Sequence, residues 1–228
     1  MPQRKIVAWA SLQEKILACK KSVDINSLQR FQGKCISLSL AVPVAKLFIR
    51  EMSHAIASAS SNGLVPLSQA LRSELIHWRF LDTWRECVPW RKERHVRLSV
   101  SSDASGYGWG AVFHESSGDQ VLSYYWYGCQ KGLNISTKEM LALINSIRAA
   151  PECVRDCCVD AFVDSQVLID SWYGQGSRKS LELTNATKDL FFVLAARDLQ
   201  LNLFTCLQEK IALMALLAGS AYLIPRCR

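Results

Sequence analysis

Residues 96–114 have the sequence VRLSVSSDASGYGWGAVFH, and this stretch decides the fold. Its first part alternates apolar and polar residues, which is the period of a strand with one buried face. After the glycine-rich turn, a second strand is expected from Trp109 to His114 and a third from Val121 to Tyr127. Three strands in direct succession predict an antiparallel meander.

Helices and strands alternate in the chain after this meander. The first helix is predicted over Thr137 to Ala150, where apolar residues repeat at helical spacing and a proline follows. The elements expected after it are a strand at Val159 to Val163, helices at Gln166 to Tyr173 and Leu183 to Asp198, and a strand at Leu199 to Thr205. The order β-β-β-α-β-α-α-β predicts an α/β fold with a mixed five-stranded sheet and flanking helices.

The chain before this fold has helical periodicity up to about Trp90. Helices are expected over residues 28–40 and 44–59, and from Pro66 to Leu81. The basic segment from Trp90 to His95 is predicted to be a junction, because the periodicity changes after it. We therefore expect a helical region at residues 1–90, an α/β domain at 91–206 and an apolar tail at 207–228.

The composition is that of a packed protein with a basic excess. Hydrophobic residues make up 50% of the chain, and Lys and Arg outnumber Asp and Glu by 27 to 20, which favours polyanionic partners. Nine cysteines, an odd number, without an apolar leader after Met1 predict reduced thiols and an intracellular location, in the cytoplasm or nucleus. The apolar run from Ile211 to Ile224 is shorter than the roughly 17–25 residues of a membrane span, so no membrane partner is expected.

Three acidic residues follow predicted elements at places where their side chains can meet. Asp103 ends the first strand, Glu139 lies in the first turn of the first helix, and Asp164 follows the fourth strand. Each also has a local explanation, as a turn residue, as a capping-box partner of Ser136 and as a helix cap respectively. If the first and fourth strands are neighbours, the three carboxylates share one crevice. Their mutual repulsion then requires a hard cation, so together they predict a metal site.

Three motifs carry these acids: SDASGYGWGA at 102–111, STKEMLAL at 136–143 and VDSQ at 163–166. With GKCISL at 33–38 and the segment from Leu81 to Arg91, they resemble the reverse transcriptases of DIRS-type retrotransposons. The similar parts are the ribonuclease H (RNase H) domain of those proteins and the segment that connects it to the polymerase. The resemblance extends over most of residues 28–206.

The resemblance implies an endonuclease that cuts the RNA strand of an RNA–DNA hybrid. Asp103, Glu139 and Asp164 would be both the catalytic residues and the ligands of two Mg²⁺ ions, with Mn²⁺ as a substitute. Asp103 would contact both ions. Such sites recognise the 2′-hydroxyl and the shape of the duplex and do not recognise its base sequence.

Residues near these acids and in the basic junction are expected to bind the substrate. Three serines beside the acids would contact phosphate or sugar, with a simple turn or helix cap as the alternative: Ser105, Ser136 and Ser165. Arg94 and Arg97 would contact the nucleic acid from the junction. The aromatic run from Tyr124 to Tyr127 either stacks on nucleotides or packs alternate members into the core.

The chain departs from the family after the last strand. The related domains continue with a segment that carries a fourth metal-binding acid, whereas Leu207 begins an apolar tail here. Codons for residues 206–227 can encode the missing ending in a shifted frame, which favours a frameshift or truncation. Two alternatives to an active RNase H domain therefore remain: a catalytically inactive nucleic-acid-binding remnant, and an interaction protein that docks through its tail.

Overall fold

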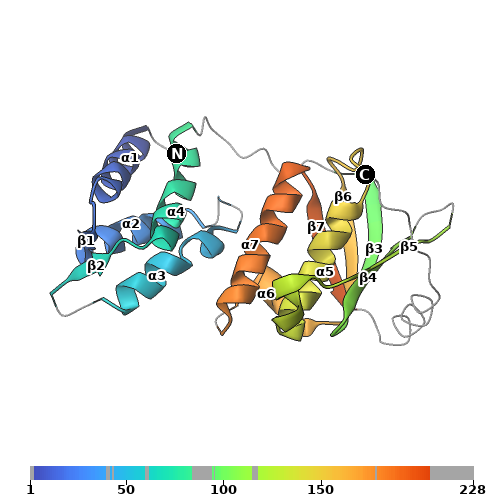
Figure 1. Cartoon of the computed structure of the whole chain (residues 1–228). Coiled ribbons are helices and arrows are strands. Elements are labelled where there is room, and N and C mark those ends of the chain that lie inside the picture. The colour runs from blue at the N-terminus through green and yellow to red at the C-terminus, as the bar shows by residue number, and fades with distance from the viewer. Residues whose placement is uncertain are drawn as a thin grey trace. The chain divides into compact units, whose positions relative to one another are not determined.

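A computed structural model describes residues 3–39, 42, 44–59, 62–83, 94, 96–114, 118–177 and 179–205. The chain divides into two compact units, Met1–Lys92 and Glu93–Arg228 (Figure 1). The predicted boundary near residue 90 and the predicted apolar tail both lie outside the described residues. The domain limits given above therefore stay predictions.

The first unit is mostly helical. Its elements in chain order are α1 (Gln3–Leu17), β1 (Ser22–Asp24), α2 (Ile25–Ser37), the 3₁₀ helix η1 (Ala45–Phe48), α3 (Arg50–Ala57), β2 (Leu64–Pro66), α4 (Gln69–His77) and the 3₁₀ helix η2 (Trp78–Thr83). Strands β1 and β2 form a small antiparallel ladder. The sequence did not predict this ladder, because three-residue strands are too short to show an alternating pattern.

The predicted start of the third helix at Pro66 is wrong. Pro66 is the last residue of β2, and α4 begins two residues after Leu67, where the Ser68 side chain accepts a hydrogen bond from the backbone N–H of Leu71. Serine is a strong helix N-cap because its hydroxyl satisfies one of the N–H groups that lack a partner in the first turn. The apolar periodicity correctly predicted a helix here, and the Ser68 cap determines the residue at which that helix begins.

The second unit contains the predicted α/β fold. Its elements are β3 (Arg97–Ala104), β4 (Gly108–His114), β5 (Gln120–Tyr125), the 3₁₀ helix η3 (Gly128–Gly132), α5 (Ile135–Ala149), β6 (Cys158–Val163), α6 (Gln166–Tyr173), α7 (Leu181–Ala196) and β7 (Gln200–Thr205). Apart from η3, which was not predicted, these bounds agree with the predicted elements to within two residues at each end. The strands form one sheet in the order β5-β4-β3-β6-β7.

The sheet is mixed, as predicted. β3 pairs with β4, and β4 with β5, in antiparallel fashion, whereas β3 pairs with β6, and β6 with β7, in parallel. The first and fourth strands of the fold, β3 and β6, are therefore neighbours. The predicted α/β class with a mixed five-stranded sheet and flanking helices is confirmed.

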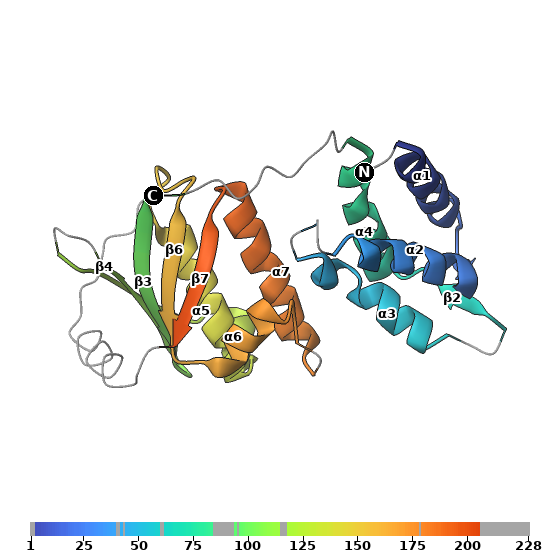
Figure 2. The same cartoon turned by 180° about the vertical axis from the view of Figure 1, so that it is seen from behind.

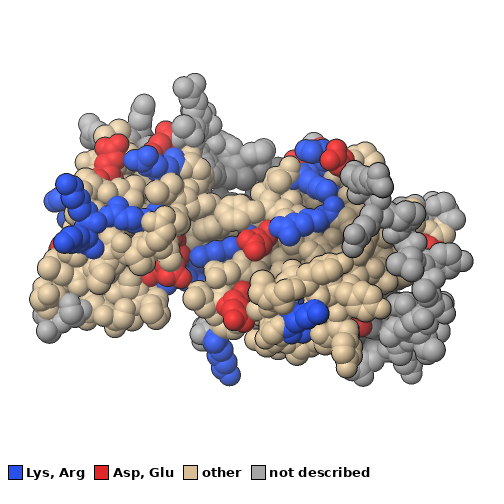
Figure 3. Space-filling model, viewed as in Figure 1, with Lys and Arg blue, Asp and Glu red and all other residues tan. Residues whose placement is uncertain are grey.

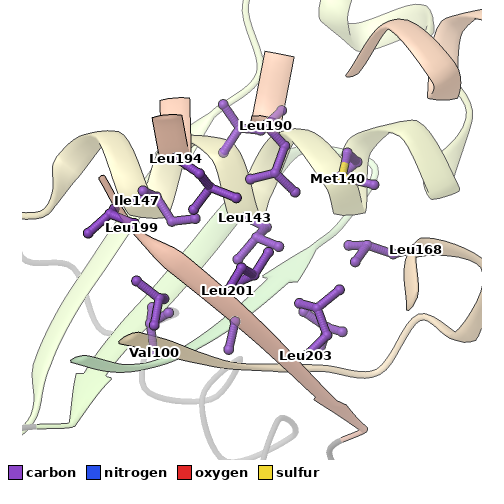
Figure 4. Close-up of a cluster of buried hydrophobic side chains, with 14 of the residues drawn as sticks. Val100, Met140, Leu143, Ile147, Leu168, Leu190, Leu194, Leu199, Leu201 and Leu203 are labelled. Carbon is purple, nitrogen blue, oxygen red and sulfur yellow. The ribbon is translucent and has the colours of Figure 1, made fainter. Parts of the chain in front are cut away.

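Helices α5, α6 and α7 lie on one face of the sheet, as Figures 1 and 2 show. The core beneath them is a continuous cluster of buried aliphatic side chains (Figure 4). Val100 from β3, Leu143 from α5 and Leu190 from α7 are each fully buried in this cluster. Burial of each such side chain contributes roughly 1.5–3 kcal/mol, so the packing fixes α5 firmly against β3.

Within the described part of the chain, no helix combines the length and the apolar character needed to cross a membrane.

Candidate functional site

The three acids singled out from the sequence meet in the second unit. Asp103 is the penultimate residue of β3, Glu139 lies in the second turn of α5, and Asp164 directly follows β6. Each offers a carboxylate oxygen, and these three oxygens lie within 4.8 Å of one another. This is the spacing at which three carboxylates can share one cation.

The sheet register explains why the acids meet. Ser101 of β3 is the partner of Phe162 of β6 in a parallel pair, so two residues further along both strands lead to Asp103 and Asp164 at the same edge. The carboxyl ends of parallel strands form a crevice there. Helix α5 packs on β3 and adds Glu139 to that crevice.

The electrostatics of the cluster are unfavourable without a cation. Burial, together with the nearby charges of Asp103 and Asp164, raises the pKa of Glu139 to about 8. Burial also raises the pKa of Asp103, with a further contribution from Asp164, although the backbone N–H of Ala104 donates to the Asp103 carboxylate at 2.8 Å and opposes the shift. Desolvation and like charge both disfavour the ionised forms. A bound divalent cation would reverse this preference.

The local explanations for Glu139 and Asp164 do not hold. The N-cap of α5 is Asn134, whose side chain accepts from the backbone N–H of Thr137, so the predicted capping box between Ser136 and Glu139 is wrong. The N-cap of α6 is Ser165 and not Asp164. Since neither acid is used to cap its helix, both carboxylates are available to the cluster.

Two of the three predicted substrate-binding serines have structural roles. The Ser105 hydroxyl accepts from the backbone N–H groups of Tyr107 and Gly108 and donates to the Gly108 carbonyl, which closes the turn between β3 and β4. The Ser165 hydroxyl accepts from the N–H of Leu168 at the start of α6. Ser136 is half-buried in the first turn of α5. A substrate contact for any of the three stays a prediction.

The two predicted arginines are not brought to the acids. Arg94 donates to Asp156 at 3.3 Å and to Asp198 at 2.6 Å, and these aspartates precede β6 and β7, at the opposite end of the sheet. Arg97 pairs with Asp160 at 3.2 Å, and the six residue steps from Arg97 to Asp103 correspond to about 20 Å of strand. The two described arginines of the junction therefore pair with aspartates of the same unit.

Sequence reasoning missed two residues that hold the site together. Lys138 is only 5% exposed, and its ammonium donates to the carbonyls of Gly106, in the turn after β3, and of Lys131, in η3. Trp126 is 1% exposed, and its indole N–H donates to the Ser105 carbonyl at 2.9 Å. A lysine beside a glutamate and one tryptophan in an aromatic run carry no sequence signal for these roles.

No family model and no curated protein matches the sequence. Among solved structures, RNase H1 from the halophilic archaeon Halobacterium salinarum is 16% identical with a TM-score of 0.40, over 50% of this chain and 89% of that one. LC11-RNase H1 in complex with an RNA/DNA hybrid is 17% identical with a TM-score of 0.42, over 50% of this chain and 86% of that one. A foamy viral protease-reverse transcriptase in complex with double-stranded DNA is 12% identical with a TM-score of 0.37, over 86% of this chain and 35% of that one. These low-identity resemblances assign no function to the present chain.

Proposed function

We propose that the second unit is an RNase H-type endonuclease domain derived from a retroelement reverse transcriptase. It would cleave the RNA strand of an RNA–DNA hybrid with divalent metal ions, Mg²⁺ or Mn²⁺. The observation that carries the proposal is the convergence of Asp103, Glu139 and Asp164, with ligand oxygens within 4.8 Å of one another.

The chemistry of the donor set supports a hard divalent cation. All three groups are carboxylates, which suit Mg²⁺ and Mn²⁺, and none is a thiolate or imidazole of the kind that selects zinc. Burial, and after it the neighbouring carboxylates, raise the pKa values of Asp103 and Glu139, and a bound cation would offset this cost of ionisation. Among the described residues, Asp103, Glu139 and Asp164 are the set of Asp, Glu, His or Cys side chains whose ligand atoms lie close enough together to hold a metal ion.

The roles of the chain's own residues follow from their placement. Asp103, Glu139 and Asp164 would hold the cations, and bound Mg²⁺ would supply an activated water and stabilise the leaving oxygen at the scissile phosphate. The Ala104 N–H orients the Asp103 carboxylate, and Lys138 fixes the turn after β3 against η3. The choice of a hybrid as substrate rests on the sequence resemblance of the three acidic motifs to DIRS-type RNase H domains.

The test is cleavage of a hybrid with a labelled RNA strand. We expect the full chain to cut the RNA only with Mg²⁺ or Mn²⁺, and Asp103→Asn to lower the rate at least about 100-fold, because a neutral amide cannot replace the ligand charge. The matched control is Asp189→Asn, an exposed aspartate on α7, which should cleave normally. Metal-dependent cleavage that survives Asp103→Asn would contradict the proposal.

The second candidate is a nucleic-acid-binding remnant without catalysis. The sequence after Thr205 supports it, because the acid that related domains carry there is replaced by apolar residues. Such a remnant would bind the hybrid with a strong dependence on salt and would cut no strand at any metal concentration. Binding and cleavage measured on the same preparation separate the two candidates.

A further inference from the structure

Three tyrosines form an exposed aromatic surface beside the acids. Tyr107 is 83% exposed, Tyr125 75% and Tyr127 71%. Single exposed aromatic residues are common, but several on adjoining segments form an apolar patch of the kind that marks an interaction site. We call these three residues the tyrosine surface.

The tyrosine surface is built onto the turn that follows Asp103. The Trp126 backbone N–H donates to the Tyr107 carbonyl at 2.9 Å, and its indole N–H donates to the Ser105 carbonyl at the same distance. Trp126 is itself buried against Ala104, the residue after Asp103. Tyr125 and Tyr127 flank this tryptophan, so their backbone is fixed to the end of β3 through a packed side chain.

Two glycines of β4 lie between Asp103 and Tyr125 in the sheet. Asp103 pairs with Gly110 of β4, and Gly108 of the same strand pairs with Tyr125 of β5. Trp109, between the two glycines, packs against the helix-covered core. A Cβ on Gly108 would meet the backbone of Tyr124, so this glycine lets β4 and β5 approach closely and carries Tyr125 next to the start of β4.

The charge around the tyrosine surface suits a polyanion. Residues 120–138 contain no acidic residue, although the unit as a whole is not basic. Lys138 in this range is buried and donates to backbone carbonyls, so Lys131 supplies the exposed positive charge. Lys131 is exposed in η3, which follows Tyr127 directly. Aromatic rings with a neighbouring cation are the combination by which proteins bind nucleic-acid strands without reading their sequence.

We propose that the tyrosine surface binds the nucleic-acid strand that runs on from the acidic site, through contacts of its rings with sugars and bases. The inference rests on the proposed function and names a second contact region for the same substrate. Two strand spacings separate β5 from β3, about 10 Å. The strand would thus meet the tyrosines close to the scissile phosphate.

The experiment measures hybrid affinity without cleavage. In the full chain with Asp103→Asn, in Mg²⁺, we compare binding of a fluorescent 20-base-pair hybrid before and after replacement of the three tyrosines by alanine. Loss of stacking on one base predicts binding weaker by about 5- to 150-fold. Replacement of the same tyrosines by phenylalanine should retain most of the affinity, because the ring makes the contact.

Controls separate a local effect from misfolding. Phe192→Ala removes an aromatic side chain that is 48% exposed on α7 and should leave binding unchanged. The thermal midpoint of the tyrosine variant should match its parent, because exposed side chains contribute little to the core. Phenylalanine variants that bind as weakly as the alanine variants would overturn the ring-contact assignment.

The outcomes distinguish this inference from the proposed function. If the wild-type chain cleaves hybrids but the alanine variant binds as tightly as its parent, the inference is wrong and the nuclease proposal stands. If the chain never cleaves but the alanine variant binds more weakly, the nuclease proposal is wrong and the tyrosine surface stands. A parent protein that does not bind the hybrid at all would overturn the inference as well.

Discussion

Glu139 is the residue at which burial and function are most directly opposed. It is 7% exposed, on a helix whose other face fills the core, and two carboxylates lie beside it. The unfolded chain would ionise this side chain near pH 4.5, whereas the folded chain without metal holds its proton up to about pH 8. A raised pKa of this kind at a buried acid is typical of functional sites.

A pH-dependent stability follows from this pKa. Between pH 4.5 and about 8 the folded state binds a proton that the unfolded state has lost, so stability decreases as the pH rises through this window. Glu139→Gln removes the ionisation, and in metal-free buffer we expect it to raise the melting temperature at pH 8.5 by about 3 °C or more. The measurement is thermal unfolding at pH 5.5 and 8.5, where the difference between the proteins should be larger at the higher pH.

Mg²⁺ should reverse the order of the melting temperatures of the wild type and Glu139→Gln. Mg²⁺ binds the ionised cluster of the wild type and stabilises its folded state in proportion to occupancy, while Glu139→Gln loses a ligand and gains less. The control is Glu182→Gln, an exposed glutamate at the start of α7, which should melt like the wild type in all conditions. An equal response of both glutamate variants to pH and Mg²⁺ would count against the shared cation site.

At the scale of elements, the site depends on how the turn after β3, η3 and the start of α5 are joined. The buried Lys138 ammonium makes this connection by donating to two carbonyl oxygens, one on each of the two other segments. Asp103 and Glu139 lie next to the joined segments. Their separation is therefore set by these hydrogen bonds as well as by the packing of α5 on β3.

Lys138→Met should lower the unfolding free energy by about 1–3 kcal/mol, because it leaves two carbonyls without their donor. It should also weaken the stabilisation by Mg²⁺, since the acids are held less firmly. Chemical unfolding with and without Mg²⁺ measures both effects. Lys179→Met, an exposed lysine before α7, is the matched control. If Lys138→Met loses stability but responds to Mg²⁺ like the wild type, the lysine supports the fold and does not position the acids.

At the scale of the whole molecule, the basic charge is unevenly divided. Residues 3–83 contain 11 Lys and Arg against 5 Asp and Glu, whereas residues 94–205 contain 10 against 12. Basic side chains are visible on both units in Figure 3. In the second unit, however, Arg94 and Arg97 are paired with aspartates. We therefore expect the first unit to supply most of the electrostatic affinity for nucleic acid.

This expectation can be tested with charge reversals. Lys20→Glu combined with Lys21→Glu, two exposed lysines before β1, should weaken hybrid binding and reduce the slope of log K against log salt by about 0.9 for each phosphate that is no longer neutralised. Lys179→Glu reverses one charge in the second unit and should change the slope by less than half as much as the double variant. The measurement is hybrid binding between about 50 and 200 mM salt. An equal change in slope per reversed charge for both variants would show that the affinity does not depend on where the basic excess lies.

The sequence by itself determined the fold class of the second unit and the three acids. Strand and helix periods differ, so β3 to β7 and α5 to α7 could be predicted to within about two residues, and Asp103, Glu139 and Asp164 stood at their ends. Short elements without a full period, such as β1 and β2, could not be found in this way.

Only the tertiary structure decided which polar and aromatic side chains belong together. The pairing of β3 with β6 placed two acids at one edge, and the burial of Glu139 raised its pKa. The structure also places Arg94 in an ion-paired cluster at the far end of the sheet. It leaves the tyrosines on either side of Trp126 exposed to solvent. These outcomes depend on contacts between residues far apart in the chain, and local periodicity contains no information about such contacts.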